Sequence, residues 1–520
     1  MLSELAPEAQ ETKTKKLKRQ APKQQIRGSS LLLVGRFLSR GVNFLVQVLI
    51  VRYLTQADYG AFAYALSLVT FSQTIATFGL DRAVTRFIPI YHEREEYDKL
   101  FGTLFMVVGS ILSLGIAMVL FVQGFQGLLA REFISDQQAL GLLMILIVLA
   151  PVQAIDNLLL GLFSVFATPK VIFFRKNILG PVLKLLVVLA LILFRGDASF
   201  LAVGYLLAGI LGVTAYIVML LPLMRKLGLF AHFDRHTIVV PWKEILAFTV
   251  PLLTSDLVYI VMNTADAVML EHFQGTIDVA ALRAVQPTAK MNQIVLASFG
   301  ILFTPLAARM FARNDKQGVN NLYWRNAIWI AVISFPVFAL TFSLAKPITV
   351  FLYGERYAGS AVILALLSFA YYFNAALGQN GLTLKVFGKV RYIVAINVFA
   401  AVANFVANLL LIPRYGALGA AMGTCGSLVL HNILKQAGLR FGTGINLFEW
   451  QYLRVYLIIT ASALGLFLVQ WLTDAPVYVS IGLAALASLV VFRMNRRLLR
   501  VGETFPELLK LPLMDKILGD

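Results

Sequence analysis

The sequence predicts an all-α polytopic membrane protein of about 14 transmembrane helices. Its 520 residues are 59% hydrophobic and only 14% charged, with a mean hydropathy of +0.78, whereas a soluble chain has about 25% charged residues. Apolar runs of membrane-spanning length recur between residues 30 and 493. The runs are continuous rather than alternating, which indicates helices and not a β-barrel. An internal repeat, described below, divides most of these helices into two lobes.

Composition also limits the chemistry that we expect. Cys425 is the one cysteine of the sequence, which excludes a disulfide framework and a thiolate metal cluster. No GxxxxGK[ST] segment is present, so ATP is not predicted to drive the protein directly. We expect no cofactor. A membrane-embedded glycan ligase or glycosyltransferase is disfavoured, because the loops are short and the five histidines are scattered. The protein is therefore not expected to be an enzyme.

The distribution of Lys and Arg predicts the orientation in the membrane. With an even number of spans, both termini lie on one side, and the segments on that side carry 34 Lys and Arg residues against 7 in the opposite segments. The positive-inside rule places the basic side in the cytoplasm. This rule also explains the formal charge of +18 without nucleic acid as a partner. The polar N-terminal segment has no hydrophobic core of a signal peptide, and we expect a disordered cytoplasmic tail. We thus predict a multi-pass protein of the cell (inner or plasma) membrane.

Five regions follow from the spans. They are a basic cytoplasmic tail at 1–29, an N-lobe with spans 1–6 at 30–225, a C-lobe with spans 7–12 at 240–440, spans 13 and 14 at 450–495, and a cytoplasmic C-terminal tail at 496–520. The longest connections, 81–100 and 223–244, have about twenty residues, so we expect no loop to fold as a domain of its own.

The two predicted lobes repeat short sequence landmarks at one offset. Asp58 after the first span corresponds to Asp278 after the seventh, at an offset of 220, and Arg195 corresponds to Arg414 at 219. Six spans are an even number, so both copies insert in the same orientation, as a parallel repeat. The expected architecture is two parallel six-helix lobes, an inverted V around a central cavity, plus two C-terminal helices. This is the architecture of an alternating-access transporter.

The first predicted span carries a polar stripe. Arg36, Arg40, Asn43 and Gln47 follow steps of four, three and four, which places them on one helix face. An arginine at the centre of a spanning helix costs about 2.5–3.5 kcal/mol on insertion scales, so such residues face a protein interior or a watery cavity. Because Arg36 lies near the helix end, its side chain could instead extend (snorkel) to the membrane interface rather than face a cavity.

Further ionisable residues lie within other spans, with more bases than acids. The candidate substrate-binding residues are Arg36, Arg40, Asn43, Gln47, Lys184, Arg283 and Lys290. The candidate ion-coupling or gating residues are Asp256, Asp266, Asp81, Arg82 and Asp156. Alternatively, Asp256 and Asp266 are structural partners of the bases. The Asp81–Arg82 pair is alternatively a solvated helix end without a gating role. A cationic cavity favours an anionic cargo, and phosphate suits the donor fork of arginine.

The chain resembles the polysaccharide-transporter branch of the multidrug/oligosaccharidyl-lipid/polysaccharide (MOP) exporter superfamily, the Wzx-type oligosaccharide flippases. The segments that carry the resemblance are "VRYLTQADYGAFAYA", "FGLDRAVTRFIP", "FTPLAARMFARND" and "IPRYGALGAAMGT". They are turn-and-helix patterns and not a catalytic signature.

This resemblance implies a function, a cargo and partners. It implies flipping of a polyprenyl-diphosphate-linked oligosaccharide from the cytoplasmic to the outer leaflet, for surface polysaccharide such as O-antigen (the glycan of lipopolysaccharide) or exopolysaccharide. Its partners would be the bilayer, a polysaccharide polymerase and other assembly proteins, and the protein itself is expected to be a monomer. An ion-coupled multidrug (MATE-like) exporter and a lipid-linked peptidoglycan precursor flippase stay open as alternatives.

Overall fold

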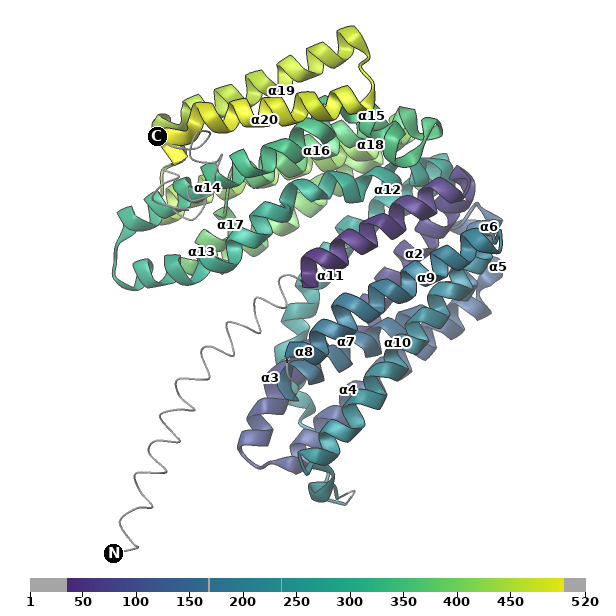
Figure 1. Cartoon of the computed structure of the whole chain (residues 1–520). Coiled ribbons are helices and arrows are strands. Elements are labelled where there is room, and N and C mark those ends of the chain that lie inside the picture. Colours follow the sequence, from purple (N-terminus) through teal and green to yellow (C-terminus); the bar gives the residue numbers. More distant parts are fainter. Residues whose placement is uncertain (1–34, 167–168, 235, 500–520) are drawn as a thin grey trace, which may run out of the picture. The chain divides into compact units, whose positions relative to one another are not determined.

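A computed structural model describes residues 35–166, 169–234 and 236–499 of the chain (Figure 1). Side chains at 169–170, 251–252, 254–259 and 261–263 lie outside the description. The predicted tail at 1–29 and residues 500–520 of the predicted C-terminal tail lie outside it as well.

The described part of the chain is helical and contains no strand. Eleven of its helical segments are long and apolar enough to cross a membrane. One of them, Val390–Thr443, has 54 residues and covers the eleventh and twelfth predicted spans. The first and seventh predicted spans coincide with a helix at 35–53 and with α11 (Trp242–Gln274). The predicted all-α polytopic membrane fold is confirmed, and each of the 14 predicted spans has a helix.

The helices of the first half follow the helix at 35–53. They are α2 (Gln56–Thr77), α3 (Leu80–Glu93), α4 (Tyr97–Gly124), α5 (Gln126–Glu132), α6 (Gln137–Leu146), α7 (Leu149–Phe166), α8 (Pro169–Ile172), the π-helix η1 (Phe173–Leu179), α9 (Gly180–Leu193), α10 (Ala198–Lys226) and the short 3₁₀-helix η2 (Leu229–His232).

The helices of the second half begin with α11. They continue as α12 (Thr276–Lys290), η3 (Met291–Gln293), α13 (Ile294–Ala312), α14 (Lys316–Phe338), η4 (Ala339–Ser343), α15 (Ala345–Tyr353), η5 (Glu355–Ser360), α16 (Ala361–Ala376), α17 (Asn380–Val386), α18 (Val390–Thr443), η6 (Trp450–Tyr452), α19 (Leu453–Thr473) and α20 (Val477–Leu499).

The chain forms two compact units. The first contains the chain up to Leu54 together with Ala65–Arg131 and Leu140–Leu257, and the second contains Thr55–Tyr64, Glu132–Ala139 and the chain from Val258. The second unit thus includes two short segments from the first half of the sequence. The domain boundaries given above stay predictions.

The predicted repeat is visible in where the helices begin. Helices α2 and α12 start at Gln56 and Thr276, 220 residues apart, and α4 and α14 start at Tyr97 and Lys316, 219 residues apart. Asp58 and Asp278 lie in the first turns of α2 and α12, where a negative charge interacts favourably with the helix dipole. The matching helix starts are consistent with the predicted repeat.

One predicted connection is wrong. Residues 81–100 were expected to be a loop, but 80–93 form helix α3. The chain turns at Phe78 and Gly79, which both have positive φ, and then resumes a helix. The α3 helix buries Leu80, Val84 and Ile88 on one face. This amphipathic pattern stabilises a helix despite the charges that made the segment look like a loop.

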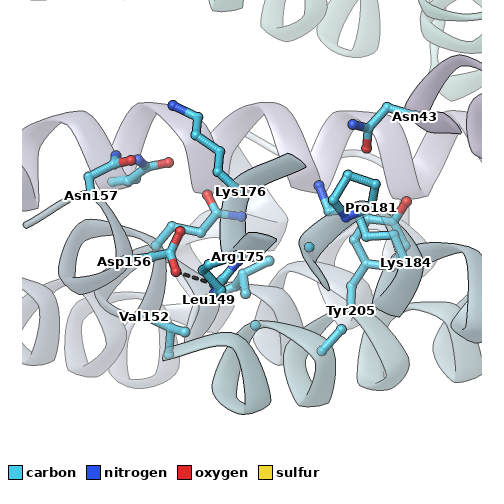
Figure 2. Close-up of a pocket in the computed structure, with 15 residues that line it drawn as sticks. Asn43, Leu149, Val152, Asp156, Asn157, Arg175, Lys176, Pro181, Lys184 and Tyr205 are labelled. Atoms are coloured by element: carbon cyan, nitrogen blue, oxygen red, sulfur yellow. Dashed lines mark hydrogen bonds and ion pairs between the residues drawn. The ribbon is translucent and has the colours of Figure 1, made fainter. Parts of the chain in front are cut away.

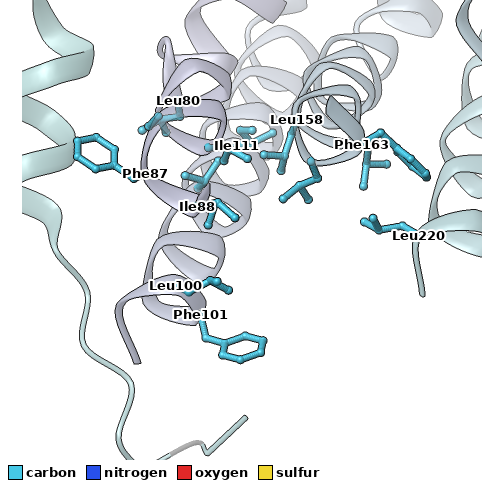
Figure 3. Packing of buried hydrophobic residues seen from close by; sticks show 14 of the residues in the cluster. Leu80, Phe87, Ile88, Leu100, Phe101, Ile111, Leu158, Phe163 and Leu220 are labelled. Atoms are coloured by element: carbon cyan, nitrogen blue, oxygen red, sulfur yellow. The ribbon is translucent and has the colours of Figure 1, made fainter. Parts of the chain in front are cut away.

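Buried side chains of α3, α4, α7 and α10 form the core of the first unit (Figure 3). Ile88, Ile111, Leu158 and Phe163 are all at most 1% exposed. Phe163 stacks on Tyr216 of α10 with ring centroids 4.9 Å apart. This core holds α7 and α10 in fixed register, and both helices carry residues of the site described next.

The second unit has its own core around α14. Buried residues of α14 and α16 pack against α19 and α20, including Trp329, Phe335, Val455 and Val491. Within this unit, α18 bends at Gly416, which has φ 55° and ψ −134°. The backbone N–H of Ala417 then donates to the carboxylate of Asp278 at 2.6 Å. The bend marks the boundary between the eleventh and twelfth predicted spans.

Candidate functional site

A polar cavity of about 370 Å³ lies within the first unit (Figure 2). Its wall combines the helix at 35–53 with α2, α7, η1, α9 and α10. The lining residues are Asn43, Gln73, Leu149, Val152, Gln153, Asp156, Asn157, Arg175, Lys176, Gly180, Pro181, Lys184, Tyr205, Ala208 and Gly209.

An ion pair forms one part of the wall. The guanidinium of Arg175 donates through Nη2 to the carboxylate of Asp156 on α7. The Arg175 side chain is 8% exposed, whereas that of Asp156 is 34% exposed and faces the cavity. Arg175 also donates through Nε to the carbonyl of Gly212 at 3.0 Å and lies over the ring of Tyr216 at 4.4 Å. Arg175 is thus held on three sides.

The local backbone explains how a charged residue reaches this position. Arg175 lies in the π-helix η1, and π-helical turns occur frequently at functional sites. On α10, a Cβ added to Gly212 would collide with the Arg175 guanidinium. The absence of a side chain at Gly212 therefore lets the arginine approach the α10 backbone closely enough to donate to it.

Two lysines give the cavity its positive charge. Lys176 and Lys184 line it and are exposed, and Lys184 lies 5.6 Å from the ring centroid of Tyr205. Three bases against one acid leave a net charge of +2. Amide side chains of Asn43, Gln73, Gln153 and Asn157 supply neutral donors and acceptors around these charges. The wall is therefore suited to an anionic, hydrogen-bonding group.

The residues of the first predicted stripe have different surroundings. Asn43 lines the cavity. Arg36 is exposed and lies within electrostatic range of Lys176. Arg40 is also exposed but is not among the described lining residues of the cavity. Gln47 is half-buried. The stripe therefore contributes Asn43 directly and the charge of Arg36 from nearby.

A second acid–base group lies in the second unit. Asp266 on α11 is 3% exposed, and its Oδ1 lies 3.5 Å from Nη2 of Arg283 on α12. Arg283 also donates to Gln286 at 2.9 Å. Lys290, the last residue of α12, is exposed. The predicted binding residue Arg283 is thus paired with a buried carboxylate. Lys290 is the more accessible of the two bases.

Four of the candidate ion-coupling or gating residues have distinct outcomes. The side chain of Asp256 lies outside the described residues. Asp81 and Arg82 lie in the first turn of α3, which begins at Leu80 after the N-cap residue Gly79. Asp156, predicted as a coupling or gating residue, is the partner of Arg175.

Sequence reasoning missed Arg175 and Lys176. Both were counted as cytoplasmic charges between the fourth and fifth spans, yet η1 continues directly into α9 and places both in the cavity wall. The sequence did contain one signal for Lys176, its spacing of eight residues from Lys184. On one continuous helix this spacing is slightly more than two turns, so the two lysines lie on a similar side of the helix.

Among the described residues, no group of three His, Cys, Asp or Glu side chains is arranged to hold a metal ion.

Comparison with known proteins gives two matching family models. The model described as "Polysaccharide biosynthesis protein" matches residues 26–311, and the model described as MatE matches residues 251–410. The capsular polysaccharide biosynthesis protein CapF of Staphylococcus aureus is 22% identical over 76% of this chain and 94% of its own length. The succinoglycan biosynthesis transport protein ExoT of Rhizobium meliloti is 23% identical over 63% of this chain and 62% of its own length.

Solved structures show the same fold. The lipid II flippase MurJ in an inward closed conformation aligns with a TM-score of 0.69 at 16% identity, over 90% of this chain and 99% of that chain. A MATE multidrug transporter of the MOP superfamily in an inward-facing conformation aligns with a TM-score of 0.63 at 14% identity, over 79% of this chain and 98% of that chain. Since a polysaccharide biosynthesis model matches more than half of the chain, the protein belongs to the polysaccharide-transporter family of the MOP superfamily.

Proposed function

We propose that the protein flips a polyprenyl-diphosphate-linked oligosaccharide from the cytoplasmic to the outer leaflet of the cell membrane. The cargo would serve the synthesis of a surface polysaccharide. The single observation that carries the proposal is the cavity of the first unit, with Arg175, Lys176 and Lys184 against one carboxylate. The names of the relatives CapF and ExoT point to the same area of metabolism.

The charge of the cavity favours a phosphate headgroup. Asp156 already pairs with Arg175, so the two lysines supply the positive charge that attracts an anion. Charge-assisted hydrogen bonds to phosphate oxygens are roughly twice as strong as neutral ones. A water-filled cavity also removes much of the cost of keeping lysines within the membrane.

The length of the cavity wall favours a headgroup larger than phosphate alone. Lys176 and Lys184 are eight residues apart on the continuous η1–α9 helix, which separates them by on the order of 10 Å along the helix axis. A diphosphate is shorter than this, so the adjoining sugar would occupy part of the wall. The amides of Asn43, Gln73 and Gln153 suit sugar hydroxyl groups, because an amide both donates and accepts.

Two alternative functions remain, and the cavity argues against one of them. The MatE model matches residues 251–410, which favours an ion-coupled multidrug exporter. A cationic drug, however, would be repelled by a cavity with net charge +2. A lipid-linked peptidoglycan precursor is also a lipid diphosphate and would satisfy the same cavity. The glycan itself therefore distinguishes the two flippase activities.

Alternating access needs an orientation and an energy source. We propose that both termini lie in the cytoplasm, in accordance with the excess of Lys and Arg in those segments. Asp266 and Asp256 are the proposed ion-coupling residues, because acids within a spanning helix are costly unless they are paired or functional. Loss of gradient-dependent transport in Asp266→Asn would support this role, and full retention would make Asp266 a structural partner of Arg283.

Glycan export in cells tests the proposal. A strain that lacks the protein is complemented with wild type, with the double variant K176A/K184A, or with R225A/K226A, which removes two exposed bases from the end of α10. At matched membrane abundance, we expect surface glycan to fall at least tenfold in K176A/K184A and to stay at the wild-type level in R225A/K226A. Wild-type export by K176A/K184A would refute the cationic-cavity mechanism.

A further inference from the structure

A second cavity, of about 390 Å³, lies in the second unit where α19 begins and α20 ends. Its lining includes four arginines, Arg454 of α19 and Arg493, Arg496 and Arg497 of α20. No described carboxylate lines this cavity. It is a separate site from the cavity of the first unit, and the function proposed above makes no use of it.

The arginines are accessible and converge on one place. Arg454, Arg493 and Arg497 are exposed, whereas Arg496 is half-buried and has other interactions. Arg493 and Arg497 are four residues apart, so they lie on one face of α20. The second residue of α19, Arg454, joins them because α19 and α20 pack against each other. Three accessible guanidinium groups are therefore available to one ligand.

The core of the unit holds this arrangement in place. Val455, next to Arg454, is fully buried, and so is Val491, two residues before Arg493. On the opposite face of α20, Asn495 is fully buried, and its amide donates to the carbonyl of Val491 within the same helix at 2.7 Å. Figure 1 shows α19 and α20 side by side, with the described C-terminal end at the end of α20. The arginines thus project from a rigid helix pair and not from a loop.

Helix ends and membrane orientation account for only part of this pattern. Basic residues are favourable at the C-terminus of α20 and at the cytoplasmic ends of spans. Neither effect distinguishes arginine from lysine, and neither requires the charges to line one cavity. All four bases here are arginines, the residue whose planar fork binds phosphate through two hydrogen bonds.

The rest of the wall is apolar. Val490, Met494 and Leu498 line the same cavity, and Val490 and Met494 are exposed. A free phosphate or diphosphate would leave this apolar surface uncovered. A phospholipid would place its phosphate on the arginines and its glycerol and first methylenes along Val490 and Met494, so that each part of the wall has a matching part of the ligand.

We propose that the arginine cavity at the α19–α20 end binds the headgroup of an anionic bilayer phospholipid. The proposal rests on the charge, the accessibility and the amphipathic lining of this cavity. Its ligand is a lipid of the surrounding bilayer, which is distinct from the cargo of the first unit.

The test measures thermal unfolding of the purified full-length protein in detergent, with increasing phosphatidylglycerol, phosphatidylcholine or inorganic pyrophosphate. The variant R454Q/R493Q/R497Q removes the three accessible charges. The control R225Q/K226Q/R391Q removes three exposed bases from α10 and α18. We expect phosphatidylglycerol to raise the Tm of wild type and of the control, and phosphatidylcholine to have little effect. The triple variant should need at least tenfold more phosphatidylglycerol for the same shift, because each charge-assisted bond contributes roughly one order of magnitude.

Several outcomes would overturn the proposal. One is a Tm shift by phosphatidylglycerol that is undiminished in R454Q/R493Q/R497Q. Another is a phosphatidylglycerol shift that is weakened as much in the control R225Q/K226Q/R391Q as in R454Q/R493Q/R497Q. A third is a Tm shift of wild type by phosphatidylcholine that equals the shift by phosphatidylglycerol. A pyrophosphate shift as large as the phosphatidylglycerol shift would identify a general anion site and contradict the lipid assignment. R493K/R497K gives a second measure, because it keeps the charge and loses the fork. A response intermediate between wild type and the triple variant supports the proposal, and a response equal to wild type contradicts bidentate phosphate binding.

Discussion

Arg175 is the charged residue whose surroundings in the first unit are most fully determined. Its guanidinium contacts Asp156, the Gly212 carbonyl and the Tyr216 ring, each from a different direction. A base in this position is too enclosed to move freely toward a cargo. We therefore interpret the Arg175–Asp156 pair as the frame of the cavity, and Lys176 and Lys184 as the groups that meet the substrate.

A double-mutant cycle tests this frame. Arg175→Met leaves Asp156 without its partner, and a broken buried pair costs about 3–5 kcal/mol. We expect a smaller loss of unfolding free energy, about 2–3 kcal/mol, since Asp156 is one-third exposed. Adding Asp156→Asn should recover part of this loss, because the uncompensated charge is then absent. Strictly additive losses in the free energy of unfolding would show that the two residues act independently.

Substitutions at Lys184 separate charge from shape. Lys184→Ala removes one of the two accessible charges, and loss of a charge-assisted bond predicts roughly a tenfold decrease in transport at limiting substrate. Lys184→Arg keeps the charge and should retain most of the activity. Lys226→Ala, at the exposed end of α10, is the matched control. Transport that is equal in Lys184→Ala and Lys226→Ala would remove Lys184 from the binding site.

At the scale of elements, breaks in the helices define the shape of each half. Gly416 bends α18, with a positive φ that side-chain-bearing residues rarely adopt, and it lies against the carboxylate of Asp278. The bend lets the backbone N–H of Ala417 reach that carboxylate. One glycine thus links the bend of α18 to the first turn of α12.

Gly416→Ala tests the importance of this bend. A residue with a Cβ at this φ and ψ costs about 1–3 kcal/mol, and its Cβ also meets the Asp278 carboxylate. We expect a lower Tm and reduced membrane abundance. Gly465→Ala in α19 is the matched control, because its Cβ would enter open space and alanine favours a helix. Equal Tm values for the two variants would mean that the bend carries no strain of its own.

Most of the helices were predictable from the sequence, and the exceptions have physical reasons. Hydropathy predicted the spans because every spanning segment must be apolar over about 20 residues. It did not predict α3, whose amphipathic face is buried within the first unit although its charges resemble those of a loop. It also missed η1, since a π-helical turn depends on backbone hydrogen bonding that no residue pattern marks.

The candidate site was predictable in kind but only partly in position. An excess of intramembrane bases was expected, and Asn43, Asp156 and Lys184 do line the cavity. Arg175 and Lys176 were missed because charge counting assigned them to a connection between spans. Arg283 was expected to bind the cargo, and that role stays a prediction. The structure pairs Arg283 with Asp266, which lies 17 residues earlier on α11, and such a pairing was the structural alternative for this acid.

For the whole molecule, the fold and family indicate a multi-pass membrane transporter, and the basic residues predict its orientation. Reporter fusions after residues 90 and 440 should report the cytoplasm, and fusions after residues 130 and 415 should report the outside. The reason is the excess of Lys and Arg in the predicted cytoplasmic segments, 34 to 7 by the predicted spans, which stays large when Arg175 and Lys176 are set aside. A reversed signal at two or more of these sites would contradict the proposed direction of transport.

Reconstituted translocation tests the central claim most directly. Proteoliposomes would carry wild type, K176A/K184A or R225A/K226A, together with a labelled polyprenyl-diphosphate-linked oligosaccharide or the same glycan on a neutral lipid. We predict that wild type and R225A/K226A move the diphosphate lipid, that neither moves the neutral lipid, and that K176A/K184A loses at least about 90% of the activity. Undiminished translocation by K176A/K184A, or equal translocation of the neutral lipid by wild type, would contradict the account.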